Sequence, residues 1–132
     1  MRPEELMIGD YVIRKNVPNE ILIVDTIDSI RDIVYLDLDG LGITERLTNI
    51  EPIPLTPEIL KKNGFVKQAY DGWLISVDNG RRQIEYRTDC CKGLLRIEHN
   101  KKPFSKLMIK VKYVHELQHA LRLCNINKKI EI

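Results

Sequence analysis

Short runs of apolar, branched residues separated by turn residues fill the first part of the chain. The runs are rich in Ile, Val, Leu and Tyr, and several alternate with polar positions, which predicts β-strands. The expected strands cover residues 7–13, 20–26, 33–39 and 43–47, with a Gly9-Asp10 turn at the entry of the first, and an extended segment with two prolines covers residues 50–55. Short strands with turns about every ten residues are typical of a small β-barrel.

A helix-start signal follows this β-rich part. Thr56 is a capping residue, Pro57 suits the first helical position, and the carboxylate of Glu58 suits the positive end of a helix. The Asn63-Gly64 pair predicts the end of the helix, because these residues adopt the left-handed conformation that closes a last turn.

A second group of strands is expected after this helix. The Asp78-Asn79-Gly80 sequence is a strong signal for a hairpin turn. The expected strands cover residues 72–77, 82–87 and 93–99, followed by a basic turn at 100–103, a strand or helix lead-in at 107–112 and a short edge strand at 129–132.

Residues 113–124 carry the clearest helix pattern in the chain. Apolar residues recur at a period of about 3.6 and form one stripe, which consists of Tyr113, Val114, Leu117, Ala120, Leu121 and Cys124. At about 100° per residue, the opposite face carries His115, Gln118, His119 and Arg122. We expect the stripe to pack against the rest of the protein and the opposite face to meet water.

Together these elements predict an α+β protein. It has a small SH3-like N-terminal β-barrel, then a helix, an antiparallel sheet and a C-terminal amphipathic helix. The Ile-Gly-Asp-Tyr-Val sequence of residues 8–12 is similar to the way such barrels often begin, a likeness of fold that carries no function. The expected units are a barrel-like unit over residues 1–55 and an α+β unit over residues 56–132 packed against it.

Composition agrees with a folded protein. The chain has 132 residues, of which 43% are hydrophobic and 30% are charged, and its formal net charge of +2 is too small to argue for nucleic-acid binding by itself. No signal peptide or membrane-spanning run is visible. The three cysteines, Cys90, Cys91 and Cys124, are odd in number and two are adjacent, which favours reduced thiols in a cytoplasmic protein. We expect Cys124 to be a core residue.

One stretch of the C-terminal helix spells a catalytic motif, His-Glu-x-x-His at residues 115–119. Histidines four residues apart share a helix face, so His115 and His119 can bind one zinc ion, and Glu116 can act as the general base on a bound water. A zinc site needs a third protein ligand, for which His99, Glu98 and Glu131 are the candidates. Solvated polar residues on the outer helix face explain the same pattern, and we favour that interpretation over a metal site.

The second half is crowded with cations. Arg82, Tyr86, Arg87, Lys101, Lys102 and Lys106 are the candidates for a binding surface that contacts nucleic acid. The alternative, which we favour, is that these residues lie on a solvated sheet face, where lysines prevent the edge strands from pairing with another chain.

Two segments carry a resemblance. Residues 50–65, which contain Ile-Pro-Leu-Thr-Pro-Glu-Ile-Leu, and the Tyr-Val-His-Glu-Leu-Gln-His sequence of residues 113–119 resemble a family of small uncharacterised proteins of Bacteroides-type mobile elements and prophages. The family pattern is Tyr-Val-His-x-Leu-Gln, which matches His115, Leu117 and Gln118 and does not require Glu116 or His119. The resemblance therefore implies that His115 and Gln118 matter for the fold or a partner contact more than for zinc.

We therefore expect a cytoplasmic, non-enzymatic binding or accessory protein that works without a cofactor and contacts nucleic acid or another protein. The alternative from a different class is a zinc-dependent hydrolase with Glu116 as its catalytic residue.

Overall fold

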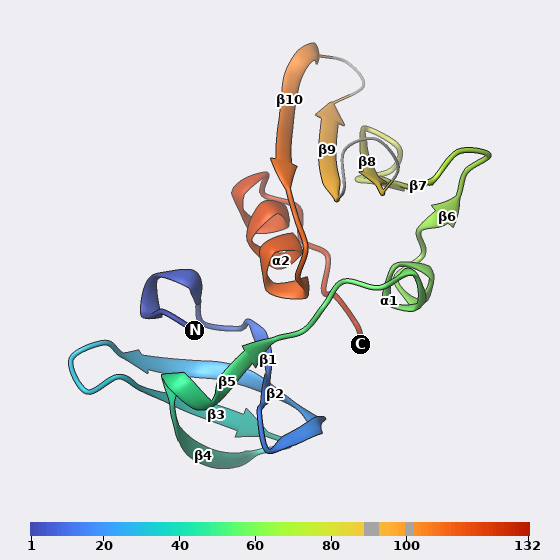
Figure 1. The fold of residues 1–132 in the computed structure, drawn as a ribbon. Coiled ribbons are helices and arrows are strands. Elements are labelled where there is room, and N and C mark those ends of the chain that lie inside the picture. Colours follow the sequence, from blue (N-terminus) through green and yellow to red (C-terminus); the bar gives the residue numbers. More distant parts are fainter. Residues whose placement is uncertain (89–92, 100–101) are drawn as a thin grey trace. The chain divides into compact units, whose positions relative to one another are not determined.

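The computed structural model describes residues 1–88, 93–99 and 102–132, without the side chains of residues 102–105. The protein is a mixed α+β chain with two five-stranded antiparallel sheets (Figure 1). It divides into two compact units, Met1–Pro54 with Tyr113–His115, and Leu55–Lys112 with Glu116–Ile132. The first unit ends at Pro54, one residue before the boundary expected from the sequence. Tyr113–His115 also belong to the first unit, which the sequence did not predict.

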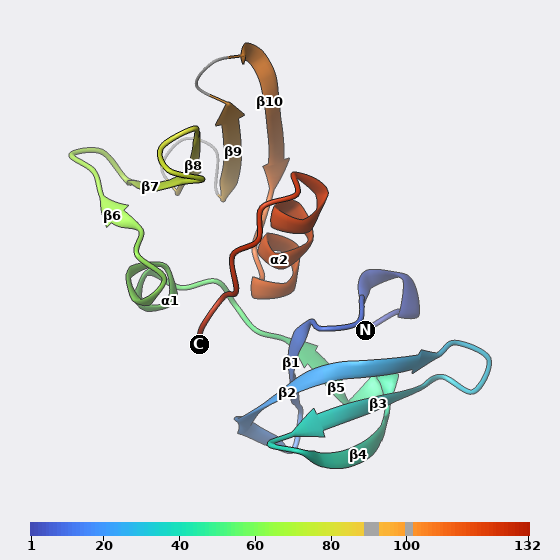
Figure 2. The ribbon, with the colours of Figure 1, turned by 180° about the vertical axis from the view of Figure 1, so that it is seen from behind.

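The first sheet has the strand order β4-β3-β2-β1-β5 (Figure 2). Its strands are β1 (Tyr11–Arg14), β2 (Val17–Asp28), β3 (Ile33–Leu38), β4 (Leu41–Arg46) and β5 (Ile50–Pro52), with one turn of 3-10 helix, Leu47–Asn49, before β5. The alternating pattern buries one face. The buried core consists of Leu6, Val12, Leu22, Val24, Val34, Leu36, Leu47 and Ile50. The register of β2 against β3 shifts between Val24 and Thr26.

The first expected strand starts at Tyr11, later than expected, and the turn expected at Gly9-Asp10 covers residues 7–10. The Asp10 side chain is buried, and its Oδ2 accepts a hydrogen bond from the backbone N–H of Met7 at 2.7 Å. Gly9 has a φ of 90°, and Ile8 is 68% exposed. An aspartate that binds its own upstream backbone competes with strand pairing, so the turn replaces the start of the strand.

The second sheet has the order β10-β9-β8-β7-β6. Its strands are β6 (Val66–Lys67), β7 (Gly72–Val77), β8 (Arg82–Arg87), β9 (Leu94–His99) and β10 (Lys102–Lys110). Asp78 and Asn79 adopt positive φ angles of 53° and 55°, as a tight hairpin turn between β7 and β8 requires. The strand β10 starts inside the expected basic turn at 100–103.

The helix α1 (Pro57–Lys62) begins at Thr56, whose hydroxyl accepts a hydrogen bond from Ile59 N at 3.3 Å. The expected edge strand at 129–132 is wrong, since these residues pair with none of the strands that the structure describes. The Asn63 side chain instead holds the backbone of Glu131, with two hydrogen bonds of 2.7 Å. The Asn63 side chain therefore binds the backbone N–H and C=O of Glu131, which a neighbouring strand would bind in a sheet.

The helix α2 (Val114–Leu123) lies within the expected range. Val114 N donates to Ile53 O at 2.9 Å, and Pro54 forms an isolated antiparallel bridge with Tyr113, so the first unit fixes the start of the helix. The expected stripe is buried at Val114, Leu117, Ala120 and Leu121. None of the helices in the described ranges is long and apolar enough to span a bilayer.

Candidate functional site

Strand register divides the second sheet into two faces. Ile84 and Tyr86 of β8 lie opposite Ile97 and Leu95 of β9, and all four side chains are buried. The alternate positions of β8, β9 and β10 make up the opposite face, which we call the outer face. It carries Glu85, Arg87, Leu94, Arg96, Glu98, Lys106, Met108 and Lys110.

A charged network covers the β8–β9 part of the outer face. Arg96 forms an ion pair with Glu85 at 3.1 Å and a longer one with Glu98 at 3.8 Å. The Tyr70 hydroxyl donates a hydrogen bond to the carboxylate of Glu85. Arg87 lies over the Tyr70 ring, 4.9 Å from its centroid, which is within the range of a cation–π contact. The network fixes an aromatic ring on a basic sheet face.

Tyr70 is the residue of this site that the sequence did not single out. Its ring is held against Gly72, where a Cβ atom would lie 2.1 Å from the ring, so a side chain at position 72 would displace it. The hydrogen bond to Glu85 raises the pKa of Tyr70, and the phenol stays a neutral donor at pH 7. The tyrosine is still 40% exposed, so the ring is open to a ligand.

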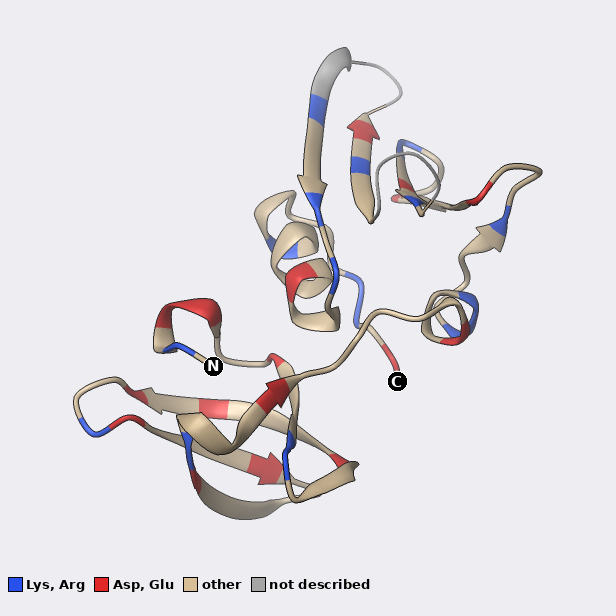
Figure 3. Cartoon of the chain, in the orientation of Figure 1, with Lys and Arg blue, Asp and Glu red and all other residues tan. Residues whose placement is uncertain are grey.

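The β10 part of the outer face has no carboxylate among its described side chains. Lys106 and Lys110 are exposed, and Met108 between them is 51% exposed. Figure 3 shows Lys and Arg positions along β9, β10 and the segment that follows. Among the described side chains of the outer face, Arg87, Arg96, Lys106 and Lys110 accompany two carboxylates, those of Glu85 and Glu98, which is a formal excess of two positive charges.

The charge of the whole chain is divided unevenly along its length. Residues 1–54 contain 5 Lys and Arg against 11 Asp and Glu, a formal charge of −6. Residues 55–132 contain 16 Lys and Arg against 8 Asp and Glu, a formal charge of +8. The small net charge is therefore the sum of an acidic part, residues 1–54, and a basic part, residues 55–132. This asymmetry favours an anionic partner for residues 55–132.

The six candidates for a binding surface do not share one face. Arg87 and Lys106 lie on the outer face, whereas Arg82 and Tyr86 lie on the buried face. Strand alternation explains the difference, because even and odd positions of β8 point in opposite directions. Lys101 and the side chain of Lys102 lie outside the described residues, as do Cys90 and Cys91.

Tyr86 is a structural residue. Its hydroxyl donates a hydrogen bond of 2.9 Å to Val111 O in a buried environment. Burial, and to a smaller extent the charge of Glu116, raise the pKa of Tyr86, so the phenol stays a neutral donor. The ring is not available to stack on a ligand.

Arg82 also has a structural partner. Its guanidinium donates to the carbonyl oxygens of Cys124 and, at 3.2 Å, of Asn125, just beyond the end of α2, and it forms an ion pair with Asp78. A cation at this end of a helix binds carbonyls that have no partner within the helix and opposes the negative end of the helix dipole. Arg82 thus joins the β7–β8 hairpin to the end of α2.

Replacing Arg82 with alanine should lower the free energy of unfolding by about 2 kcal/mol, because charged hydrogen bonds to partly buried groups are lost. The matched control is Arg81→Ala, which removes the same charge from an exposed neighbouring position and should change stability by less than about 0.5 kcal/mol. Urea denaturation measures both. Equal effects of the two substitutions would contradict the structural role of Arg82.

The faces of α2 differ from the expectation at two residues. His115 is 5% exposed and Gln118 is 8% exposed, so the expected solvent-facing positions are wrong for both. The His115 ring stacks on Tyr113, with centroids 5.9 Å apart and an interplanar angle of 14°. His119 is half-buried and Arg122 is exposed. The two buried polar residues are the ones that the Tyr-Val-His-x-Leu-Gln pattern retains.

The candidate third zinc ligands have different surroundings. Glu98 lies on the outer face beside Arg96, and the backbone of Glu131 pairs with Asn63. His99 lines an open pocket of about 280 Å³ with Arg82, Ile97 and Cys124. Over residues 1–88, 93–99 and 102–132, no three His, Cys, Asp or Glu side chains are grouped as ligands of one metal ion. The zinc-dependent hydrolase with Glu116 as base stays a prediction.

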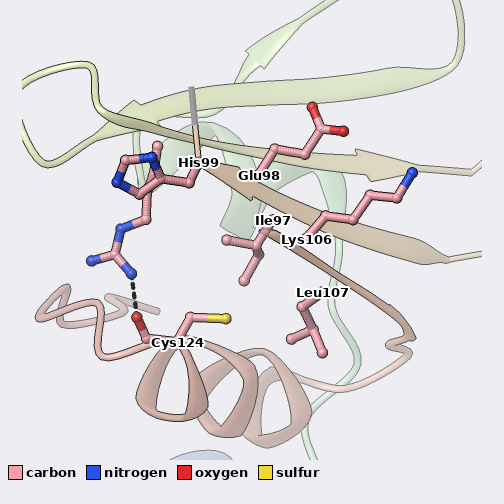
Figure 4. A pocket seen from close by; sticks show the side chains of 7 residues that line it. Ile97, Glu98, His99, Lys106, Leu107 and Cys124 are labelled. Carbon is pink, nitrogen blue, oxygen red and sulfur yellow. Dashed lines mark hydrogen bonds between the residues drawn. The ribbon is translucent and has the colours of Figure 1, made fainter. Parts of the chain in front are cut away.

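The pocket beside His99 has an apolar floor. Figure 4 shows Ile97, Leu107 and Cys124 lying toward one another, whereas the side chains of Glu98 and Lys106 point away. Cys124 is half-buried, and burial raises the pKa of its thiol, so the reactive thiolate is disfavoured. The pocket combines a thiol that burial holds protonated with an arginine that binds the carbonyl oxygens beyond α2.

Comparison of the chain with protein-family models, curated proteins and solved structures returned no match.

Proposed function

We propose that the protein is a cytoplasmic, non-enzymatic accessory module that binds single-stranded nucleic acid on the outer face of its second sheet. The observation that carries the proposal is the outer face itself, where Arg87 lies over the exposed ring of Tyr70 and Arg96, Lys106 and Lys110 share the same face of the sheet. Single strands bind to surfaces that combine backbone-tracking cations with aromatic rings on which bases stack. The charge of +8 over residues 55–132 supports an anionic ligand for this part of the chain.

The roles of the residues follow from their positions. Tyr70 offers a ring for one base, and Arg87 behind it holds the ring in place. Lys106 and Lys110 lie on the same face of β10, about 13 Å apart along an extended strand, and would contact backbone phosphates. Glu85 fixes Tyr70 and Arg96 and contacts no ligand.

The proposal extends to the first unit and to the origin of the protein. The strand order β4-β3-β2-β1-β5, the long β2 and the 3-10 turn before β5 support an SH3-like fold for the first unit. The two segments at residues 50–65 and 113–119 support membership of a family encoded by mobile elements or prophages. An accessory protein that binds nucleic acid or a partner protein fits such elements.

Fluorescence anisotropy with a labelled oligothymidylate strand tests the proposal. At physiological salt we expect a dissociation constant between about 1 and 100 μM, as for non-specific binding, and tighter binding at low salt. Tyr70→Ala should weaken binding about tenfold, because one stacked base contributes roughly 1–3 kcal/mol. Tyr70→Phe is the matched control, since it keeps the ring and loses only the hydrogen bond to Glu85, and it should bind within about threefold of the wild type.

Two results would reject the proposal. One is the absence of binding to any single strand at low salt. The other is binding that Tyr70→Ala leaves unchanged, because the ligand would then contact a different surface. A duplex of the same length distinguishes the two nucleic-acid forms, and the stacking argument predicts weaker binding to the duplex, whose bases are not free.

A further inference from the structure

The first unit contains a hollow on its sheet that the nucleic-acid proposal does not use. It has a volume of about 480 Å³ and crosses β2, β3 and β4. We call it the β4 groove, and it is lined by Asp25, Thr26, Tyr35, Leu36, Gly42, Ile43 and Thr44. Tyr35 lies between Thr26 and Thr44 in the strand register, so its ring forms one side of the groove.

Gly42 makes the groove deeper than a regular sheet face. It lies in β4 opposite Asp37, and a Cβ atom built at this position would meet nothing within 4 Å. Its φ is not in the left-handed region, so the backbone does not require glycine here. The missing side chain leaves room for a group from another molecule.

The groove opens beside a sheet edge. In the part of the chain that the structure describes, β4 pairs with β3 and lies at the end of the strand order. Leu41 at its start is 63% exposed. An exposed edge strand offers backbone N–H and C=O groups to an added strand, and side chains of that strand point alternately into neighbouring pockets.

The charge around the groove selects the occupant. Asp25 lines the groove, Asp37 faces Gly42, and the first 54 residues carry a formal charge of −6. Tyr35 is 36% exposed and offers a ring face to a cation. Carboxylates and an aromatic ring around an open hollow complement a lysine or arginine side chain.

We propose that the β4 groove binds an extended basic segment of a partner protein, which adds as a strand to the edge of β4. A lysine or arginine of that segment enters the hollow over Gly42, between the Tyr35 ring and the Asp25 carboxylate. The surface lies in the first unit, so the proposal is independent of nucleic-acid binding by the second sheet.

A fluorescent peptide of about nine residues in which lysine and valine alternate is the probe, because its side-chain period matches an added strand. Gly42→Val fills the hollow without a clash at Cβ and should weaken peptide binding about tenfold. Asp25→Asn removes one groove charge and should weaken it about threefold. Amide chemical shifts should change most along β4 when the peptide binds to the wild type.

Matched controls separate the groove from general charge attraction. Glu51→Gln removes a carboxylate from an exposed position on β5, at the other edge of the same sheet, and should leave binding unchanged. A peptide in which proline replaces the valines keeps the charge and cannot pair as a strand, so it should bind at least about tenfold more weakly.

Three outcomes would overturn the proposal. The first is equal binding of the peptide to the wild type and to both groove variants. The second is equal binding of the two peptides to the wild type, which leaves only charge attraction. The third is a wild type that sediments as a dimer and a Gly42→Val variant that sediments as a monomer, because the occupant is then a second copy of this chain. Circular dichroism checks that the Gly42→Val variant is folded. If it is not folded, peptide binding by the Asp25→Asn variant tests the proposal.

Discussion

Replacing Gly93 with alanine should lower the free energy of unfolding by about 3–5 kcal/mol, the largest effect that we expect from a single methyl group. Gly93 has a φ of 90°, which disfavours any L side chain. A Cβ atom there would also lie 2.6 Å from Val111 O and 3.0 Å from the Tyr86 hydroxyl oxygen. The backbone must move, and the hydrogen bonds from Tyr86 to Val111 O and from Val111 N to Gly93 O are lost or strained.

Gly80→Ala is the matched control for this prediction. Gly80 also has a positive φ, 82°, but a Cβ atom at that position meets nothing within 4 Å. It should therefore show the backbone cost alone, about 1 kcal/mol. Chemical denaturation of the two variants measures the difference, which isolates the contact with Val111. A Gly93 variant as stable as the Gly80 variant would show that Gly93 does not approach Val111 closely.

Replacing Asn63 with alanine should lower the free energy of unfolding by about 2–4 kcal/mol. The buried Asn63 amide donates to Ile59 O at 2.8 Å and to Glu131 O at 2.7 Å, and its Oδ1 accepts from Glu131 N at 2.7 Å. Two of these bonds join residues 68 positions apart in the chain. Their loss leaves the backbone groups of Glu131 without this partner and weakens the attachment of the C-terminal segment to α1, in which Lys62 still donates a hydrogen bond to Ile132 O.

The controls for Asn63 use the same residue type. Asn127→Ala removes an exposed asparagine from the same segment and should change stability by less than about 0.5 kcal/mol. Asn63→Asp keeps the acceptor for Glu131 N and loses both donors, so its cost should be intermediate. Amide hydrogen exchange at Glu131 should accelerate in Asn63→Ala. Unchanged exchange would contradict the role of this side chain.

Local signals predicted most of the elements. The Thr56-Pro57-Glu58 start and the Asp78-Asn79-Gly80 turn act through neighbouring residues, and the helix and the hairpin are found where these signals place them. The α+β class with an antiparallel second sheet follows from the same signals. The errors lie where distant contacts decide, as at residues 129–132, whose backbone binds the Asn63 side chain in place of a strand.

The faces of α2 show a limit of periodicity. The apolar stripe predicts which residues must be buried, and Leu117, Ala120 and Leu121 are buried. It cannot predict that His115 and Gln118 are buried too, because polar residues on the other face have the same pattern whether protein or water covers them.

The candidate site was harder to predict than the fold. Clustered cations in the second half indicated the second sheet as a candidate surface, but the face of each residue depends on strand register. Arg82 and Tyr86 were therefore grouped with residues of the opposite face. Tyr70 lies in a loop between β6 and β7, and its contacts with Glu85 and Arg87 come from residues at least 15 positions away.

The salt dependence of single-strand binding tests the central claim most directly. Each phosphate contact that a lysine makes should contribute about 0.7 to the slope of the logarithm of the binding constant against the logarithm of salt concentration. The double variant Lys106→Gln/Lys110→Gln should therefore lower the magnitude of this slope by about 1.4. The matched double variant Lys128→Gln/Lys129→Gln, with the same charge loss in the segment after α2, should leave it unchanged. Equal slopes for the two double variants would contradict nucleic-acid binding by the outer face.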